Sequence, residues 1–149
     1  MVAPDSGSNT ITVNANSSSF LAGESVAYYG VSQTCTLPNA ATGNQTSQTT
    51  WSQSATPTTA NSWVVGDVQE AGGNPLAAGS GTTLRTTDSG SIGFFDNNAP
   101  VSVATTLNYA QTGSPPSANW SGIIFTLAPA AVASVASKPY NWIEQWWNI

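Results

Sequence analysis

Short apolar and β-branched runs alternate with clusters of Gly, Pro, Asn and Ser along most of the chain. Runs of this kind, bounded by turn-forming residues, are typical of β-strands. The sequence shows no helix-period apolar stretch with caps before residue 130. The pattern predicts about eight strands, over Thr10–Val13, Ser25–Val31, Thr49–Ser52, Trp63–Val68, Thr82–Thr86, Ser91–Phe95, Val101–Tyr109 and Trp120–Leu127.

Two of these runs indicate how their faces are used. In Val101–Tyr109, every second residue is apolar or threonine, which predicts a strand that is buried on one side. In Trp120–Leu127, both faces carry bulky side chains, so we expect a central strand. By contrast, segment 36–60 is long and polar. We expect it to cross between sheets or to run over the surface, with one short strand around Trp51.

The number and spacing of the strands predict the fold class. A chain of 149 residues fits one ordinary domain. About eight short strands without helices suit an all-β, antiparallel two-sheet sandwich, either a jelly roll or an immunoglobulin-like fold. We expect this sandwich over residues 1–129, and an Ala-rich linker with an aromatic C-terminal tail over residues 130–149.

The aromatic tail is the first candidate functional element. Three of the six tryptophans lie in the last eight residues. Exposed, such a tail would be prone to aggregation, so we expect it to dock. It can fold back onto its own sandwich or bind a neighbouring copy, and contact with a membrane interface is disfavoured because Lys138 is its only cation. The predicted assembly residues are Tyr140, Trp142, Ile143, Trp146, Trp147 and Ile149.

Charge and composition exclude several classes of function. The chain has two cations against seven carboxylates and no histidine. Two cations cannot neutralise a run of phosphates, so we expect no nucleic-acid partner. Without histidine there is no Ser-His or Cys-His nucleophile and no histidine-ligated zinc. The composition therefore predicts a protein that is not an enzyme.

The carboxylates form no diagnostic pattern. A glycosidase needs two acids that face each other across a cleft, and the available ones, Asp67, Glu70, Asp88 and Asp96, show no such pairing in the sequence. Calcium could use oxygens around Asp96 or Asp88, but the spacing of a calcium loop is absent and these positions suggest turns first. We therefore predict no cofactor and no metal.

Targeting signals and the cysteine count give a weak indication of location. The chain lacks an apolar run of membrane-spanning length and the basic, apolar start of a signal peptide. Its single cysteine, Cys35, excludes an intrachain disulfide and suggests a small packed residue. We expect no membrane insertion and a location outside the cell or on a virion surface, reached by lysis if no signal is present.

Three segments resemble a known type of module: Ser25–Gln33, Asn61–Gly66 and Asn119–Pro129. The stretch over residues 25–130 is similar to the C-terminal part of a β-sandwich module found in secreted bacterial proteins and in phage tail and fibre structural proteins. In that family more strands precede the first segment than this chain offers. The resemblance thus implies an incomplete sandwich, to which the tail or a neighbouring subunit adds a strand. It implies no catalytic residues.

These features together predict a non-enzymatic structural subunit of an extracellular filament or a virion, of the tail, fibre or decoration type. We expect copies to assemble into a homo-oligomer through their termini and an open sheet edge. The alternative is a carbohydrate-binding or adhesion module that recognises a surface glycan through stacked aromatics. Trp51, with polar neighbours on both sides, is the expected glycan contact, whereas Trp63 and Trp120 lie inside predicted strands.

Overall fold

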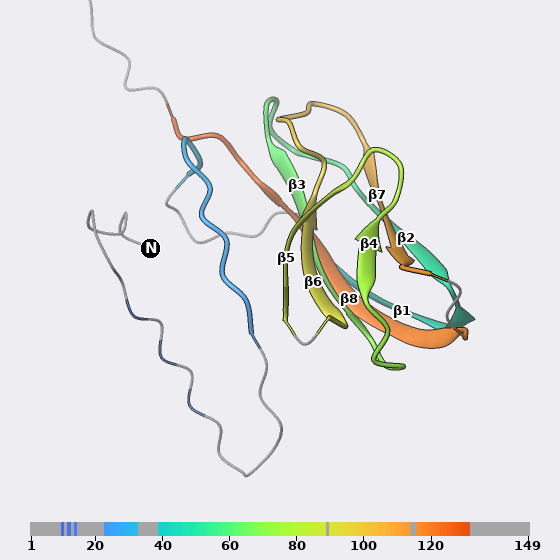
Figure 1. Ribbon diagram of the computed structural model, residues 1–149. Helices are drawn as coiled ribbons and strands as arrows, with labels where there is room; N and C mark the ends of the chain where they lie inside the picture. The colour runs from blue at the N-terminus through green and yellow to red at the C-terminus, as the bar shows by residue number, and fades with distance from the viewer. Residues whose placement is uncertain are drawn as a thin grey trace, which may run out of the picture.

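The computed structural model describes residues 10, 12, 14, 23–32, 39–88, 90–113 and 116–131. All regular secondary structure in this part of the chain is β (Figure 1). Eight strands form two antiparallel sheets, which confirms the predicted sandwich. The strands are β1 (Ala41–Gln48), β2 (Thr50–Ala55), β3 (Trp63–Glu70), β4 (Leu76–Ala78), β5 (Thr83–Asp88), β6 (Ile92–Asp96), β7 (Thr105–Gln111) and β8 (Ala118–Leu127).

The strand order distinguishes between the two predicted sandwich types. The five-stranded sheet has the order β1-β8-β3-β6-β5, and the three-stranded sheet has the order β2-β7-β4. Strand β1 pairs with β8, β2 with β7 and β3 with β6, so the pairs are nested like the two halves of one long hairpin. These nested pairs are those of a jelly roll, except that β4 and β5 do not pair with each other: β4 pairs with β7, and β5 pairs with β6 in the other sheet. An immunoglobulin-like sandwich would instead place the first two strands side by side in one sheet.

The core lies between the two sheets and is made by inward-facing residues of β2, β3, β4, β6, β7 and β8. Phe95 on β6 meets Tyr109 on β7 with ring centroids 4.9 Å apart, in an edge-to-face arrangement that aromatic pairs favour. Trp120 is 2% exposed, and its indole N–H donates to the Gln48 carbonyl at 3.0 Å, which ties β8 to the end of β1. The core residues are Trp51, Ala55, Val64, Val68, Leu76, Phe95, Leu107, Tyr109, Trp120 and Ile124.

The structure confirms the prediction of β8 as a central strand, because β8 lies between β1 and β3. The prediction for segment 36–60 was wrong in part, since this segment contains β1 as well as β2. Nearly every side chain of β1 is exposed, because β1 lies at the edge of its sheet. A strand that buries neither face has no apolar alternation, and the sequence pattern therefore missed it. Strand β4 was missed because it has only three residues.

Three other predicted strands need correction. Residues Ser25–Val31 form no regular strand, and only Val31 makes an isolated bridge, to Pro129. The strand predicted over Val101–Tyr109 begins only at Thr105, because Val101 pairs with Ser62 in a single bridge and the chain bends before β7. Of the strand predicted over Thr10–Val13, Thr10 and Thr12 belong to no strand, and the other two residues lie outside the described part of the chain.

Candidate functional site

Trp51, the expected glycan contact, is a core residue. It is 8% exposed, and its ring packs against Tyr109 with centroids 5.7 Å apart. Gly43 and Gly122 leave room for the indole, because a Cβ at either position would lie about 3 Å from the ring, at 2.9 and 3.1 Å. The expectation that Trp51 is exposed was therefore wrong. Its polar neighbours mark the outward face of β2, whereas Trp51, Gln53 and Ala55 alternate inward.

The predicted assembly residues, Tyr140, Trp142, Ile143, Trp146, Trp147 and Ile149, lie outside the described residues, as does Cys35. The boundary between a sandwich over residues 1–129 and a tail over residues 130–149 stays a prediction. Strand β8 ends at Leu127, shortly before that boundary.

Of the four carboxylates weighed as possible catalytic acids, Glu70, Asp88 and Asp96 accept hydrogen bonds from neighbouring groups, and Asp67 is half-buried on β3. Glu70 is 1% exposed and accepts hydrogen bonds from the backbone N–H groups of Gly72 at 2.6 Å and Asn74 at 2.7 Å, so it closes the turn after β3. Asp88 accepts from the N–H of Gly23 at 3.1 Å. In the described ranges, no group of three His, Cys, Asp or Glu side chains is placed to hold a metal ion.

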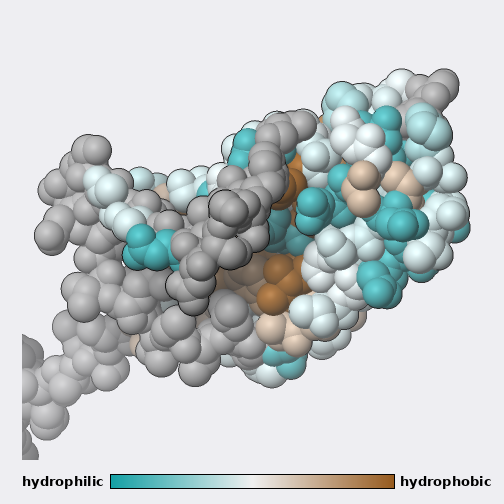
Figure 2. Space-filling view, turned by 90° about the horizontal axis from the view of Figure 1, so that it is seen from below, coloured by the Kyte–Doolittle hydropathy of each residue, from teal (hydrophilic) through white to brown (hydrophobic). Residues whose placement is uncertain are grey.

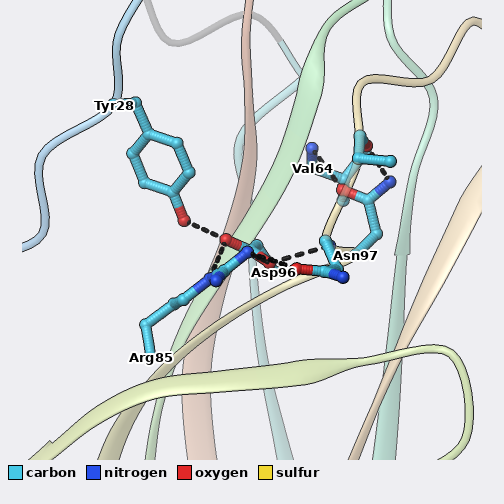
Figure 3. A network of polar contacts seen from close by, with 7 residues as sticks. Tyr28, Val64, Arg85, Asp96 and Asn97 are labelled. Atoms are coloured by element: carbon cyan, nitrogen blue, oxygen red, sulfur yellow. Dashed lines mark hydrogen bonds and ion pairs between the residues drawn. The ribbon is translucent and has the colours of Figure 1, made fainter.

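Asp96 is the centre of a polar network that sequence reasoning missed (Figure 3). Its side chain is fully buried and receives hydrogen bonds from three residues. The Arg85 guanidinium donates from Nε to Oδ2 at 2.6 Å and from Nη2 to Oδ1 at 2.9 Å. The Tyr28 hydroxyl donates to Oδ2 at 2.5 Å, and the backbone N–H of Asn98 donates to Oδ1 at 2.8 Å. This saturation explains how a charged group can lie inside the sheet.

The network also affects the ionisation of its donors. The hydrogen bond to Asp96 raises the pKa of Arg85 above its usual value. Burial, followed by the hydrogen bond to Asp96, raises the pKa of the Tyr28 phenol. Both groups therefore remain hydrogen-bond donors throughout the neutral pH range. The hydrogen bond from Tyr28 to Asp96 is not lost through titration of Tyr28 or Arg85 in that range.

Residues 23–32, here called the N-terminal arm, lie against the face of the five-stranded sheet that points away from the core (blue in Figure 1). Glu24, Val26 and Tyr28 are half-buried, and the residues between them are exposed. The Tyr28 ring packs against Trp63 at 5.2 Å and Phe94 at 6.3 Å. The arm therefore covers apolar side chains that the jelly roll leaves outside its core.

The C-terminal end of the arm is held by backbone hydrogen bonds to the residues that follow β8. The N–H of Ser32 donates to the carbonyl of Ala128, and the N–H of Ala130 donates to the carbonyl of Gly30, both at 2.8 Å. Tyr29, just before this contact, is 92% exposed. The arm thus has backbone contacts near both ends and the Tyr28 hydroxyl between them.

Charge is distributed unevenly over the described part of the chain. Strands β1, β2, β4, β7 and β8 contain no charged residue. In the face shown in Figure 2, the described surface is largely polar, with the strongest hydrophobic colour near the middle and paler hydrophobic areas elsewhere. The polar character of half of the sandwich thus rests on hydroxyl and amide groups. The charged residues are Glu24, Asp67, Glu70, Arg85, Asp88 and Asp96, on the arm, β3, β5 and β6.

The four edge strands, β1 and β5 in one sheet and β2 and β4 in the other, also differ in charge and regularity. Strand β5 carries Arg85 and Asp88 and has an irregular register between Leu84 and Thr86, and β4 has only three residues. Charge, bulges and shortness are the usual protection of an edge against pairing with another chain. On the other side, β1 and β2 have eight and six residues without charge or proline. The register of β1 with β8 is regular from Ala41 to Gln45 and shifts only beyond that.

No helix in the described residues is long and apolar enough to cross a membrane. Comparisons of the chain with family models, with curated proteins and with solved structures found no match.

Proposed function

We propose that the protein is a non-enzymatic structural subunit of an extracellular filament or a virion, and that its copies assemble through an open sheet edge and their termini. The observation that supports this proposal most directly is the unequal protection of the edges. Strands β4 and β5 are short, charged or irregular, whereas β1 and β2 are long, uncharged and next to each other in the sequence.

The chemistry of the β1–β2 side fits contact with another copy of the chain. An edge strand presents unpaired N–H and C=O groups that another strand can satisfy. Removing hydroxyl and amide side chains from water costs less than removing charges, and the centres of protein interfaces are depleted in charged residues. The jelly-roll order is also an architecture of viral capsid domains. Each of these points favours assembly over catalysis.

Charges placed on β1 should prevent edge pairing. We expect the double variant Thr42→Lys/Asn44→Lys to remain as free subunits at concentrations at which the unchanged chain forms particles. Both side chains are exposed on the regular part of the edge. Each pair of like charges that faces across a new strand pair costs about 0.2–1 kcal/mol, and the dehydration of lysine adds to this. Light scattering with negative-stain imaging measures the outcome.

The matched control is Thr87→Lys, which adds charge at an exposed position of the protected edge strand β5. It should leave assembly unchanged. If the double variant on β1 assembles as well as the control, the β1 edge is not an assembly contact. Free subunits from the unchanged chain at all concentrations would contradict the structural function itself.

The C-terminal tail is tested by a chain that ends at Ala136. We expect this truncated chain to fold but to lose large particles, because docking of a few Trp and Ile side chains contributes about 1.5–3 kcal/mol for each side chain that is fully buried. Circular dichroism reports the fold, and light scattering reports the particle mass. Particles of unchanged size and order would exclude the tail as an assembly element and leave the edge proposal standing.

A further inference from the structure

Glu24 on the N-terminal arm occupies an unfavourable place for a carboxylate. Both of its side-chain oxygens are buried, and no side chain of the described residues donates a hydrogen bond to them, so only the backbone groups of Asp88 and Phe94 offset their charge. The arm places it against β3 and β5, where Asp67 and Asp88 contribute further negative charge. This contrasts with Asp96, on the same face of the sheet, whose buried carboxylate is saturated by donors. An ionised carboxylate that is buried beside two other acids opposes the docking of the arm.

The surroundings of Glu24 determine how the docking responds to acid. Burial, and then the charge of Asp67, raise the pKa of Glu24 above its ordinary value of 4.5, and nearby backbone groups of Asp88 and Phe94 offset part of this rise. Burial also raises the pKa of Asp67. Glu24 therefore binds its proton more tightly when the arm is docked. By linkage, docking is most favourable below the ordinary pKa and weakens as the pH rises through the raised one.

We propose that the N-terminal arm is a pH-sensitive cover: it holds to the outer face of the five-stranded sheet most firmly in acid, and its contacts from Glu24 to Tyr28 loosen as the pH rises. The groups that face Glu24 are Asp67 from β3 and Asp88 from β5, with the Phe94 backbone from β6. Arg85, the one cation among the described residues, is engaged by Asp96 and Asn98. No described cation therefore offsets the charge at the Glu24 end.

Lifting of the arm would change the surface of the protein. The rings of Trp63 and Phe94 pack against Tyr28. The Phe94 ring also packs against that of Phe125, with ring centroids 6.5 Å apart. Without the arm, these side chains would meet water. The cover thus controls the exposure of an apolar face that is separate from the β1–β2 side, and this inference does not depend on the proposed function.

Fluorine NMR of the full chain labelled with fluorotyrosine tests the proposal. The chain has four tyrosines, of which Tyr29 is 92% exposed and Tyr109 is 1% exposed, so free and buried reference signals are built in. A Tyr28→Phe variant assigns the arm signal. Between about pH 7 and about pH 5 we expect the Tyr28 signal to move away from that of Tyr29, with a docking constant that rises up to about tenfold for each unit of raised pKa.

The decisive variant is Glu24→Gln, which removes the charge and keeps the size of the side chain. We expect its Tyr28 signal to stay at the docked position at both pH values, and the Tyr109 signal to report an unchanged core. Ser25→Gln, at the exposed neighbouring position, should titrate like the unchanged protein. A Tyr28 signal that ignores pH in the unchanged chain, or a Glu24→Gln variant that titrates in the same way, would overturn the proposal.

Discussion

Replacing Asp96 with alanine is expected to lower the free energy of unfolding by about 3–5 kcal/mol, since one partner of a buried ion pair is lost. The Asp96 side chain is fully buried, whereas that of Arg85 is 31% exposed and can regain water. The backbone N–H of Asn98 and the Tyr28 hydroxyl also lose their acceptor. A domain of this size is typically stable by only about 5–15 kcal/mol, so much of its stability would be lost.

Urea denaturation followed by tryptophan fluorescence measures this loss. Thr87→Ala, at an exposed position of β5, is the control and should change stability by no more than about 0.5 kcal/mol. A double-mutant cycle with Arg85→Met separates the coupling of the pair from the other contacts of each residue. Equal stability of the Asp96→Ala variant and the control would show that the network does not support the fold.

Trp120→Ala is expected to have a comparable effect, with a loss of about 3–5 kcal/mol, because a large buried ring leaves a cavity between the sheets. Trp120 is 2% exposed and belongs to the central strand β8. The substitution also removes the hydrogen bond to the Gln48 carbonyl, so we expect the end of β1 to loosen before the rest of the sheet.

Urea denaturation measures the loss in the free energy of unfolding for Trp120→Ala, and amide hydrogen exchange shows which strands are destabilised most. The control is Ser121→Ala, whose side chain points outward from the same strand. Amide protection should fall more in β1 than in β6, which is separated from β8 by β3. A uniform fall in protection would contradict the role of Trp120 in holding β1, even if the global loss is as large as expected.

The parts of the fold that the sequence predicted are those with a buried face. Strands β3, β6 and β8 were found because their apolar residues pack between sheets, and the number of turns between them pointed to a sandwich. Strand β1 was not found, because a polar edge strand is defined by its hydrogen bonds to β8 rather than by side-chain pattern. The jelly-roll order likewise depends on which strands pair, which periodicity does not contain.

The residues of the arm were missed for a related reason. Tyr28 and Asp96 are 68 positions apart, and only the folded sheet brings them together. A partial signal existed, since Arg85 is one of two cations in the chain, and a carboxylate at the end of the apolar run of β6 needs such a partner. Trp51 shows the opposite error, because polar neighbours on a strand mark the alternate face and do not expose the residue between them.

The unequal edges have a geometric consequence for assembly. With β4 and β5 protected, the edge pairing that we propose is confined to the β1–β2 side of the sandwich. Two copies that pair across this side through the same residues are related by a two-fold axis, and such an isologous contact consumes the open edge of both. The pairing then closes at the dimer and cannot extend. Growth into a filament or shell would need a second contact of heterologous type, and the repeating unit would be the dimer rather than the single chain.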